Sequence, residues 1–438
     1  MHVPIFPYCF LSERVVKSLE GVLKREAGME EQIPKLREDI EIIPTFHQKQ
    51  RAIIVRDSLG LIKEPLLLYG EVLSFIALID GKRNIRDIQL DLIREKNGVF
   101  VTSEEVEKIL SELDSIFLLD SERYRQEKKR IISSYSLLQL RTAFHAGRSY
   151  PKEPEKLRAL LDSFFSNEEE LRLPEKGKKV AALIAPHIDL EIAKKVYAKA
   201  YQTIKNSNPE RVILLGTGHN IYGSFLSLTE KEFETPFGRV RTDKDWVRKL
   251  RRAGGKMVAD DDLAHQSEHS LEFQLIFLQH LFESEFFLIP ILCGAFDKIL
   301  EKVSRPREVP EIKKFLEELQ ICFEELDSGS LIVAGVDFSH IGPKFGHNQK
   351  ASSMLLEAKN HDKLLIDSIC NGDIEGFWSE LKRVHNTYNV CGLSPLACLL
   401  EIQPGAKGSL LAYDFWQEDS TQSAVSFAAV AIERKEHF

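Results

Sequence analysis

Apolar residues follow two different patterns along this chain, and the change falls near residue 140. The first part is rich in charged residues and carries apolar residues at helical spacing. From residue 178 onward, continuous apolar runs alternate with amphipathic segments. Such a change in pattern indicates a domain boundary. We therefore expect a small N-terminal domain over residues 1–135 and a larger domain over residues 136–438.

The N-terminal part predicts a small winged-helix-like α+β domain. Residues 71–119 have the pattern of three helices, the first two separated by a turn at Asp80-Gly81, and the strand-like "RAIIVRD" precedes them. The third helix is expected to begin in a capping box at Ser103, with Val106 where glutamate would be ideal. Acidic residues on that helix would repel phosphate, so we expect a recognition or packing role rather than DNA reading.

The second part predicts an α/β domain with a mixed sheet. Four apolar runs, "KVAALIAPH", "RVILLGTGH", "FFLIPILCG" and "SLIVAGVDFSH", are typical of buried parallel strands, and amphipathic helices lie between them. Two later segments, "GSLLAYDFW" and "AVSFAAVAIER", predict a further pair of strands that runs antiparallel.

Composition narrows the class of protein. The 438 residues carry a formal net charge of −8 without a basic cluster, which argues against a nucleic-acid partner. The six cysteines show no CxxC spacing, so we expect a cytoplasmic protein without a disulfide framework or zinc finger. No apolar run approaches the ~18 residues of a membrane helix, and we expect no membrane association.

Histidines follow three of the predicted strands. His187, His219 and His340 each come after an apolar run, and Asp337 lies just before His340. Open α/β sheets bind ligands beyond the carboxyl ends of their strands, so these side chains are expected to meet at one edge. A single histidine there is more often structural, but three at equivalent places favour a functional site.

Two further segments bring donors to this edge. In "HQSEHSLEF", Ser267 is expected to cap an apolar helix, with Glu268 and His269 in its first turn. Glu268 would then interact with the helix dipole, and His269 would stay neutral. In "VHNTYNVCGLSP", Cys391 precedes another apolar helix and is a candidate thiolate ligand, whereas Cys398 within that helix belongs to the core.

These residue types predict a mononuclear transition-metal site. Imidazoles combined with a thiolate or carboxylate suit Fe, Cu or Zn better than Mg or Ca. Metal-bound imidazoles usually donate their second N–H to an acceptor, and Asp337 is the expected acceptor. Gly216 and Gly218 ahead of His219 are expected to leave room above the metal. The sequence lacks a GxSxG elbow, a Walker loop and a GxGxxG motif, which argues against serine hydrolysis and nucleotide binding.

Seven short motifs occur in one order after residue 140: "FHAGRSYP", "APHIDL", "GTGHN", "EHSLEFQL", "DFSHIG", "HNTYNVCGLSP" and "STQSAVSFAAVAI". In this order they resemble the Memo family, also called protein B of the AmmeMemoRadiSam system. The resemblance implies a fold similar to the catalytic subunits of class III non-haem iron extradiol dioxygenases. In the N-terminal part, "LIDGKRNIRDI" and "LLDSERY" resemble small peptide-chaperone domains of the PqqD kind.

The Memo resemblance implies a ligand set of His187, His219 and Cys391, the cysteine standing where the dioxygenases have glutamate. It also implies a group of residues beside the metal. His340 would act as acid/base, and the other expected catalytic residues are Asp337 and His269. His145 of the opening motif is a further candidate for the pocket.

The sequence departs from the common Memo pattern at three places. Asp189 adds a carboxylate two residues after His187, and we expect it to affect substrate shape or metal preference. Asn220 stands where some members have a second histidine. Residues 388–390 lengthen the loop before Cys391, so the position of this thiol is the least well defined of the expected ligands.

Three functions are compatible with the sequence. An Fe or Cu centre with open coordination positions would support a redox or oxygenase-like reaction on a small substrate. A metal-binding scaffold without turnover is the second interpretation, and the family's associations imply radical-SAM and AMMECR1-like partner proteins for it. A zinc hydrolase is the third, because histidine-rich sites with a nearby acid activate water.

Overall fold

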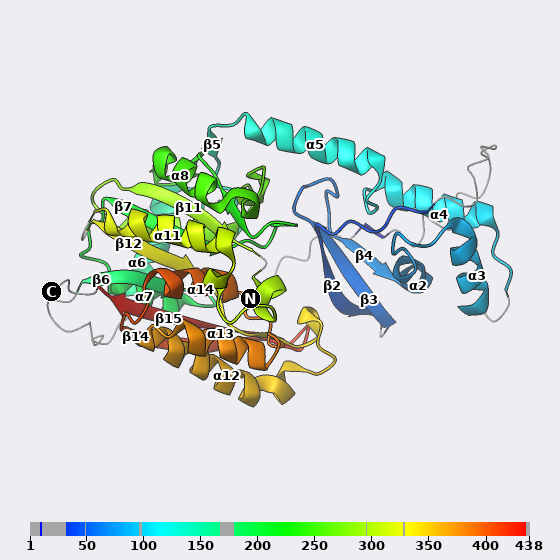
Figure 1. The fold of residues 1–438 in the computed structure, drawn as a ribbon. Coiled ribbons are helices and arrows are strands. Elements are labelled where there is room, and N and C mark those ends of the chain that lie inside the picture. Colours follow the sequence, from blue (N-terminus) through cyan, green and yellow to red (C-terminus); the bar gives the residue numbers. More distant parts are fainter. Residues whose placement is uncertain are drawn as a thin grey trace. The chain divides into compact units, whose positions relative to one another are not determined.

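The computed structural model describes residues 9–10, 32–48, 50–95, 99–166, 179–294, 296–326 and 329–434. The chain divides into two compact units, Met1–Ser134 and Tyr135–Phe438, and each is described by itself (Figure 1). Within the described ranges, no helix combines the length and the apolar character that crossing a membrane requires.

The N-terminal unit combines a small sheet with helices. Its strands follow the order β1-β4-β3-β2, in which β2, β3 and β4 are antiparallel neighbours and β1 pairs with β4 in parallel. The strands are β1 (Cys9–Phe10), β2 (Ile40–His47), β3 (Gln50–Asp57) and β4 (Leu66–Tyr69). The helices are α2 (Glu71–Ala77), α3 (Ile85–Glu95), α4 (Ser103–Ser115) and α5 (Glu122–Ser136). Val55, Phe75, Ile88 and Val106 meet in the core of this unit.

The three predicted helices are present as α2, α3 and α4, but the capping prediction is wrong by one residue. Thr102, not Ser103, precedes the first turn of α4 and accepts the backbone N–H of Glu105. The Glu105 carboxylate in turn accepts the backbone N–H of Thr102 at 2.8 Å, which completes the capping box. The apolar pattern does not predict β2, because Pro44 within it argues against a strand.

The larger unit is built on an 11-stranded mixed sheet. Along its main path the order is β13-β15-β6-β12-β7-β11-β10-β9-β5, while β14 pairs with β15 and β8 with β11. The four predicted buried strands are β6, β7, β11 and β12, which are parallel neighbours at its centre. The two C-terminal strands form the predicted antiparallel pair, β14 and β15, so the mixed α/β fold is confirmed.

The elements of the larger unit have the following bounds. The strands are β5 (Leu140–Arg141), β6 (Val180–Ala185), β7 (Arg211–Thr217), β8 (Leu226–Leu228), β9 (Glu232–Thr235), β10 (Gly238–Thr242), β11 (Phe287–Cys293), β12 (Ser330–Gly335), β13 (His340–Ile341), β14 (Gly408–Glu418) and β15 (Ser423–Glu433). The α-helices are α6 (Pro154–Phe165), α7 (Lys194–Gln202), α8 (Lys244–Gly254), α9 (His269–Leu281), α10 (Asp297–Leu300), α11 (Pro310–Glu324), α12 (Ala351–Asn371), α13 (Ile374–Arg383) and α14 (Leu393–Ile402).

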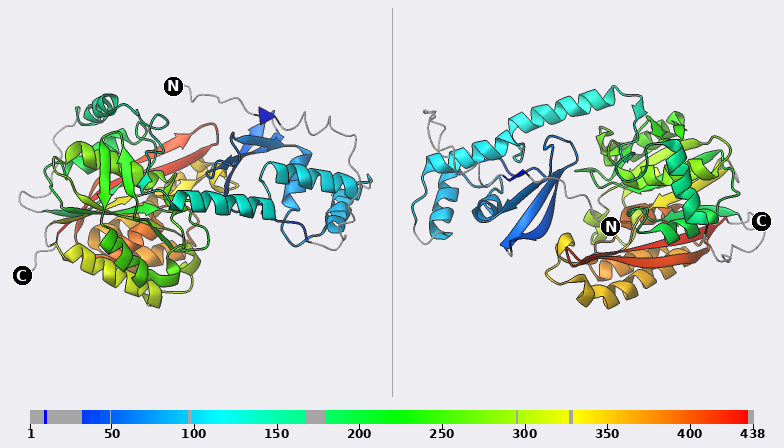
Figure 2. Two further views of the ribbon diagram at one scale, coloured as in Figure 1. Left: turned by 90° about the horizontal axis from the view of Figure 1, so that it is seen from above. Right: turned by 180° about the vertical axis from the view of Figure 1, so that it is seen from behind.

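Helices cover both faces of the central strands (Figure 2). Ile213 and Leu215 of β7 belong to the core that α8, α11 and α14 share with one face of the sheet. Val212 and Leu214 belong to the core on the other face, where α6, α7 and α9 pack. Because both faces are buried, every position of the strand favours an apolar side chain, which explains the continuous runs in the sequence.

Two glycines allow α9 to approach the ends of the central strands. A Cβ atom on Gly335 of β12 would lie 2.3 Å from the backbone oxygen of Ser270, and one on Gly216 of β7 would lie 2.5 Å from Ser270 Oγ. A side chain at either position would therefore push the first turn of α9 away from the sheet. This close contact brings His269, the first residue of α9, to the edge where His187 and His219 lie.

A buried histidine is expected to make the stability of the larger unit depend on pH. His265 has no exposed surface, neither of its ring nitrogens has a hydrogen-bond partner among the described residues, and burial lowers its pKa to about 4. Above pH 6.5 the ring is neutral in both folded and unfolded chains. As the pH falls from 6.5 towards 4, the unfolded chain takes up a proton that the folded chain does not, so folding becomes less favourable by up to about 3 kcal/mol.

Urea unfolding at several pH values tests this prediction. The free energy of unfolding should fall more steeply between pH 6.5 and 4.5 in the wild type than in His265→Gln, which cannot titrate there. Equal pH slopes for the two proteins would contradict it, whatever the difference in their stability at pH 7.

Candidate metal centre

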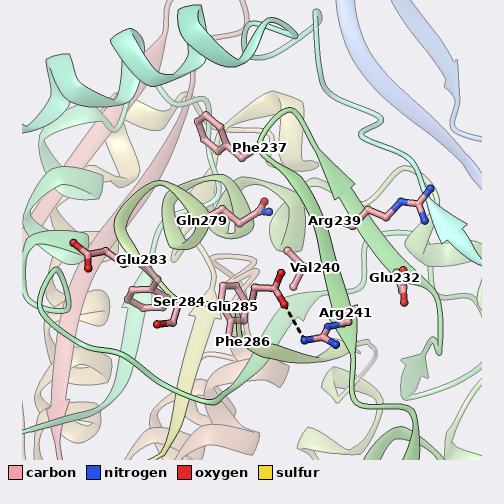
Figure 3. A pocket seen from close by; sticks show the side chains of 11 residues that line it. Glu232, Phe237, Arg239, Val240, Arg241, Gln279, Glu283, Ser284, Glu285 and Phe286 are labelled. Atoms are coloured by element: carbon pink, nitrogen blue, oxygen red, sulfur yellow. Dashed lines mark hydrogen bonds and ion pairs between the residues drawn. The ribbon is translucent and has the colours of Figure 1, made fainter.

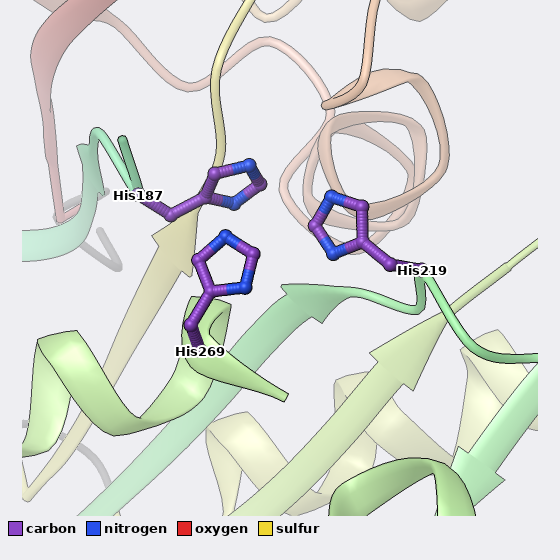
Figure 4. Close-up of side chains that lie close together, drawn as sticks. All are labelled: His187, His219 and His269. Atoms are coloured by element: carbon purple, nitrogen blue, oxygen red, sulfur yellow. The ribbon is translucent and has the colours of Figure 1, made fainter. Parts of the chain in front are cut away.

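Three histidines from separate elements converge at the carboxyl edge of the central strands (Figure 4). His187 follows β6, His219 follows β7, and His269 begins α9. Each offers one ring nitrogen, and these three atoms lie within 4.8 Å of one another. Small side-chain rotations would bring such a group to the ~2.0–2.1 Å at which imidazole nitrogens bind a transition metal. The three residues therefore form a possible metal-binding site.

The thiol of Cys391 lies beside these histidines. Its Sγ atom is 3.0 Å from Nε2 of His187 and 3.5 Å from Oγ1 of Thr217. The longer loop before it is fixed by Asn389, whose side-chain amide donates to the carbonyls of His340 and Phe345 at 3.3 and 3.1 Å. The thiol therefore lies beside His187, although the group of donors within 4.8 Å of one another contains His269 and not Cys391.

Opposite charges balance one another within the centre. Burial opposes ionisation of Cys391, but His187 and His219 outweigh it and lower the pKa of the thiol well below its usual range. Burial likewise opposes protonation of His187, but Cys391 and Asp337 raise its pKa to about 9. Metal binding requires thiolate and neutral imidazole, so a bound cation would displace the protons of these imidazoles.

Glu268 orients His219, a role that the sequence pattern does not assign. Its carboxylate oxygens lie 3.0 and 3.1 Å from Nδ1 of His219, and they also accept the backbone N–H groups of His219 and Ser270. Glu268 is the N-cap of α9, so the prediction that Ser267 caps this helix is wrong. Burial opposes ionisation of Glu268, but His219 outweighs it and lowers the pKa of the carboxyl. A carboxylate bound to the outer nitrogen of a histidine is typical of metal sites.

Glu268→Gln is expected to weaken transition-metal affinity by about 10–100-fold, because the amide holds the Nδ1–H of His219 less strongly. The matched control is Ser267→Ala, which removes a hydroxyl that accepts only a long hydrogen bond, 3.5 Å, from the side-chain amide of Asn220. Competition titrations with a chelating dye would measure both affinities. Equal affinities for wild type and Glu268→Gln would show that this carboxylate does not support the centre.

Asp337 lies close to His187, but not as the predicted acceptor of its second ring N–H. The Nδ1 atom of His187 pairs with the carbonyl of Gly335 at 2.9 Å. Asp337 instead accepts the backbone N–H of His187 at 3.0 Å, and its other oxygen lies 3.5 Å from Nε2. Asp337 therefore fixes the main chain of His187 and faces the inner side of the centre. Burial raises the pKa of this carboxyl.

His269 has the low basicity that the sequence predicts, and the cause is mainly burial. Burial and the neighbouring His219 and His187 outweigh Glu268 and lower the pKa of His269 well below its usual value. The ring is stacked on that of His219, with centroids 4.9 Å apart. His269 is thus placed among the metal-capable donors.

His340 and His145 lie around the centre. The Nδ1 atom of His340 pairs with the carbonyl of Phe338 at 3.0 Å, and His340 is among the groups that lower the pKa of Cys391. The ring of His145 is 5.8 Å from that of His269, and its Nε2 atom donates to the carbonyl of Ser267 at 2.9 Å. His145 therefore packs against His269.

A buried carboxylate network holds His340 in its loop. Ser339, the residue before it, donates a hydrogen bond to Asp362 of α12 at 2.6 Å. Asp362 has no exposed surface and also accepts from the hydroxyls of Ser426 and Tyr413 at 2.6 and 2.7 Å. Three hydroxyl donors satisfy this carboxylate and connect the His340 loop to α12, β14 and β15.

The expectation for the two glycines is corrected, while the structure shows a local contact of Asp189. Asp189 is exposed, and its carboxylate accepts the backbone N–H of Glu191 at 2.9 Å, so it stabilises its own turn. A Cβ on Gly218 would lie 2.3 Å from the Ile221 side chain, and Gly216 admits α9. The two glycines therefore make room for other parts of the chain and not for a substrate.

The opening motif is held against α9 by Glu272, which is completely buried. Its carboxylate accepts hydrogen bonds from the Arg141 guanidinium, from the Tyr150 hydroxyl and from the backbone N–H groups of Phe144 and His145. Arg141 also donates to the carbonyl of Glu268 at 2.8 Å. The motif "FHAGRSYP" thus has a structural role, which is to fix the chain that leads into His269.

Two cavities differ in their relation to this centre. One of about 420 Å³ lies between the β9–β10 hairpin and the end of α9, where Arg241 and Glu285 form an ion pair, and none of the predicted site residues line it (Figure 3). Another of about 250 Å³ is lined by Thr217 and Cys391 and therefore reaches the centre itself.

Comparison with known proteins agrees with the motifs. The family described as Memo-like protein matches residues 141–431. This chain belongs to the Memo family. A MEMO1 family protein of Aquifex aeolicus is 31% identical over 387 residues, covering 86% of this chain and 95% of the relative. Others from Methanopyrus kandleri and Thermus thermophilus are 31% and 27% identical, covering 66% and 80% of this chain and 97% and 99% of those relatives. The Memo domain has the class III extradiol dioxygenase-like fold.

Proposed function

We propose that this Memo protein binds one transition-metal ion through His187, His219 and Cys391 and supports a redox or oxygenase-like reaction on a small substrate. The observation that carries the proposal is the 3.0 Å approach of the Cys391 sulfur to Nε2 of His187, beside the histidine group. His269 belongs to that group, so it is close enough to act as a fourth donor or to contact the substrate.

The donor set fits such an ion. Imidazoles with one thiolate favour Fe or Cu and also suit Zn, whereas Mg and Ca prefer oxygen ligands. When bound, the metal would supply electron transfer or polarise a substrate oxygen. A thiolate of this kind requires a reducing compartment, which supports a cytoplasmic location.

The chain's own residues orient the centre and handle protons. Glu268 orients His219, and Asp337 fixes the main chain of His187. His340, the first residue of β13, would hold or move a proton as acid/base. His187, Asp337 and Glu268 are buried, which strengthens the electrostatic interactions among them.

Metal analysis and oxygen consumption test the proposal in two steps. Protein purified anaerobically should contain close to one equivalent of Fe, Cu or Zn per chain, and reloading with Fe²⁺ should restore a depleted sample. Loaded protein is then tested for oxygen uptake with a panel of catechols and other small reductants. Absence of stoichiometric transition metal would overturn the site, while full loading without uptake would reject oxygenase activity for that panel.

A metal-binding scaffold is the second candidate, and the separate N-terminal unit favours it. Among the described residues, the one metal-capable histidine group lies in the larger unit, so the small unit has a different task. As a PqqD-like domain it would recognise a peptide or a radical-SAM or AMMECR1-like partner. Zinc hydrolysis is the third candidate, and finding Zn without redox-active metal would favour it.

A further inference from the structure

The cavity that reaches Cys391, here called the Cys391 recess, forms an approach to the metal centre from outside the histidine group. It has a volume of about 250 Å³, below the ~300–1,000 Å³ of pockets for drug-sized ligands. Thr217 and Cys391 line it, and Cys391 is partly exposed although His187 beside it is buried. The recess therefore borders Cys391 and has room for small molecules only.

The charged side chains in its walls have one sign. The described residues that line the recess include no Lys, Arg or His, and Asp297, which is exposed at the start of α10, is their one carboxylate. Uncharged hydrogen-bonding side chains come from Thr217, Asn386, Asn389 and Ser394. Asn386 accepts the backbone N–H of Val390 through its Oδ1 atom at 3.0 Å, and within the described part of the chain its amide N–H groups have no hydrogen-bond partner. An anion entering here would meet the charge of Asp297, which no Lys, Arg or His of the same lining offsets, before it reached the protonated imidazoles beside Cys391.

We propose that the Cys391 recess is the entrance by which a small, uncharged or cationic polar molecule reaches the centre, and that Asp297 discriminates against carboxylates and phosphates. The inference rests on the proposed function for its biological meaning, since it names the class of substrate for the same centre. Charged groups at the mouth of a cleft with low-dielectric walls focus the field on an entering molecule, so one carboxylate suffices to change entry rates.

Alkylation of Cys391 measures entry directly. Chelator-treated full-length protein is reacted with iodoacetamide, which is uncharged, or iodoacetate, which is an anion of similar size, and the Cys391 peptide is quantified by mass spectrometry. The ratio of the two rates in the folded protein should exceed the ratio for the same cysteine in the urea-unfolded chain by about fivefold. In Asp297→Asn the excess should fall to about twofold, and in Asp297→Lys it should disappear or reverse.

The matched control is Asp245→Asn, which removes an exposed carboxylate on α8 whose side chain is 88% exposed. This variant should leave the ratio of the iodoacetamide rate to the iodoacetate rate unchanged. Adding 0.5 M salt to the urea-unfolded chain should also leave that ratio unchanged. Three results would overturn the inference. The ratio of the two alkylation rates could be the same in the folded and unfolded chains, or it could stay unchanged in both Asp297 variants. The third is that neither reagent reacts with Cys391 in the folded protein.

Addition of metal separates this inference from the proposed function. Anaerobic Fe²⁺ or Co²⁺ should slow alkylation of Cys391 by either reagent if the sulfur is a ligand. If metal does not slow alkylation but iodoacetamide is still preferred over iodoacetate, Cys391 is not a ligand and the entrance remains supported. If metal slows alkylation but neither reagent is preferred, Cys391 remains a ligand and the entrance is rejected.

Discussion

His187→Ala is expected to weaken transition-metal binding by at least about a hundredfold, since loss of a residue that only orients a ligand already costs about 10–100-fold. His187 is 2% exposed and its Nε2 atom lies 3.0 Å from Cys391 Sγ, so alanine would remove one of the donors beside the thiol. Anaerobic titration with Co²⁺ would give the affinity, and the thiolate-to-metal charge-transfer band would report on the sulfur.

Two further variants make this result specific. Cys391→Ser should abolish the charge-transfer band while leaving weaker binding by the imidazoles. His47→Ala, in the N-terminal unit, removes a histidine outside the metal-capable group and should preserve both affinity and spectrum. Unchanged metal occupancy in His187→Ala would place the ion elsewhere, whatever the folding of the variant.

The parts of the site that follow strands could be predicted from the sequence, because parallel strands end at a shared edge. His187 and His219 come directly after β6 and β7, so the pattern that identifies the strands also places these histidines. The position of His269 is harder to predict, because the start of a helix gives no information about the strands that the helix lies over. Gly216 and Gly335 decide that contact by admitting α9, which shows only in three dimensions.

The partners of the site residues could not be predicted, because hydrogen bonds between distant residues leave no periodic signal. Glu268 and His219 are 49 positions apart, and the sequence suggests for Glu268 only an interaction with the helix dipole. Asp337 was correctly expected near a histidine, but the carbonyl of Gly335 takes the role predicted for it. Backbone acceptors carry no side-chain signature, so residue types alone favour the carboxylate.

Glu272→Gln is expected to destabilise the larger unit by about 3–5 kcal/mol, the cost of leaving one member of a buried ion pair without its partner. Glu272 and Arg141 are 0% and 1% exposed, and the carboxylate accepts four groups of the opening segment. The amide of Gln cannot accept from all four donors, and the Arg141 charge would remain buried. Tyr150→Phe, which removes one of the donors, should cost only about 1–2 kcal/mol.

The matched control is Glu317→Gln in α11, whose ion pair with Lys313 spans 3.8 Å between side chains 48% and 55% exposed. Exposed pairs contribute about 0–1 kcal/mol, so this variant should unfold at nearly the wild-type urea concentration. Equal destabilisation by the two substitutions would mean that the opening segment is held by packing alone. Because Arg141 also binds the carbonyl of Glu268, Glu272→Gln should in addition weaken metal binding at urea concentrations where the protein remains folded. That second effect distinguishes a contact that positions the centre from one that only stabilises the fold.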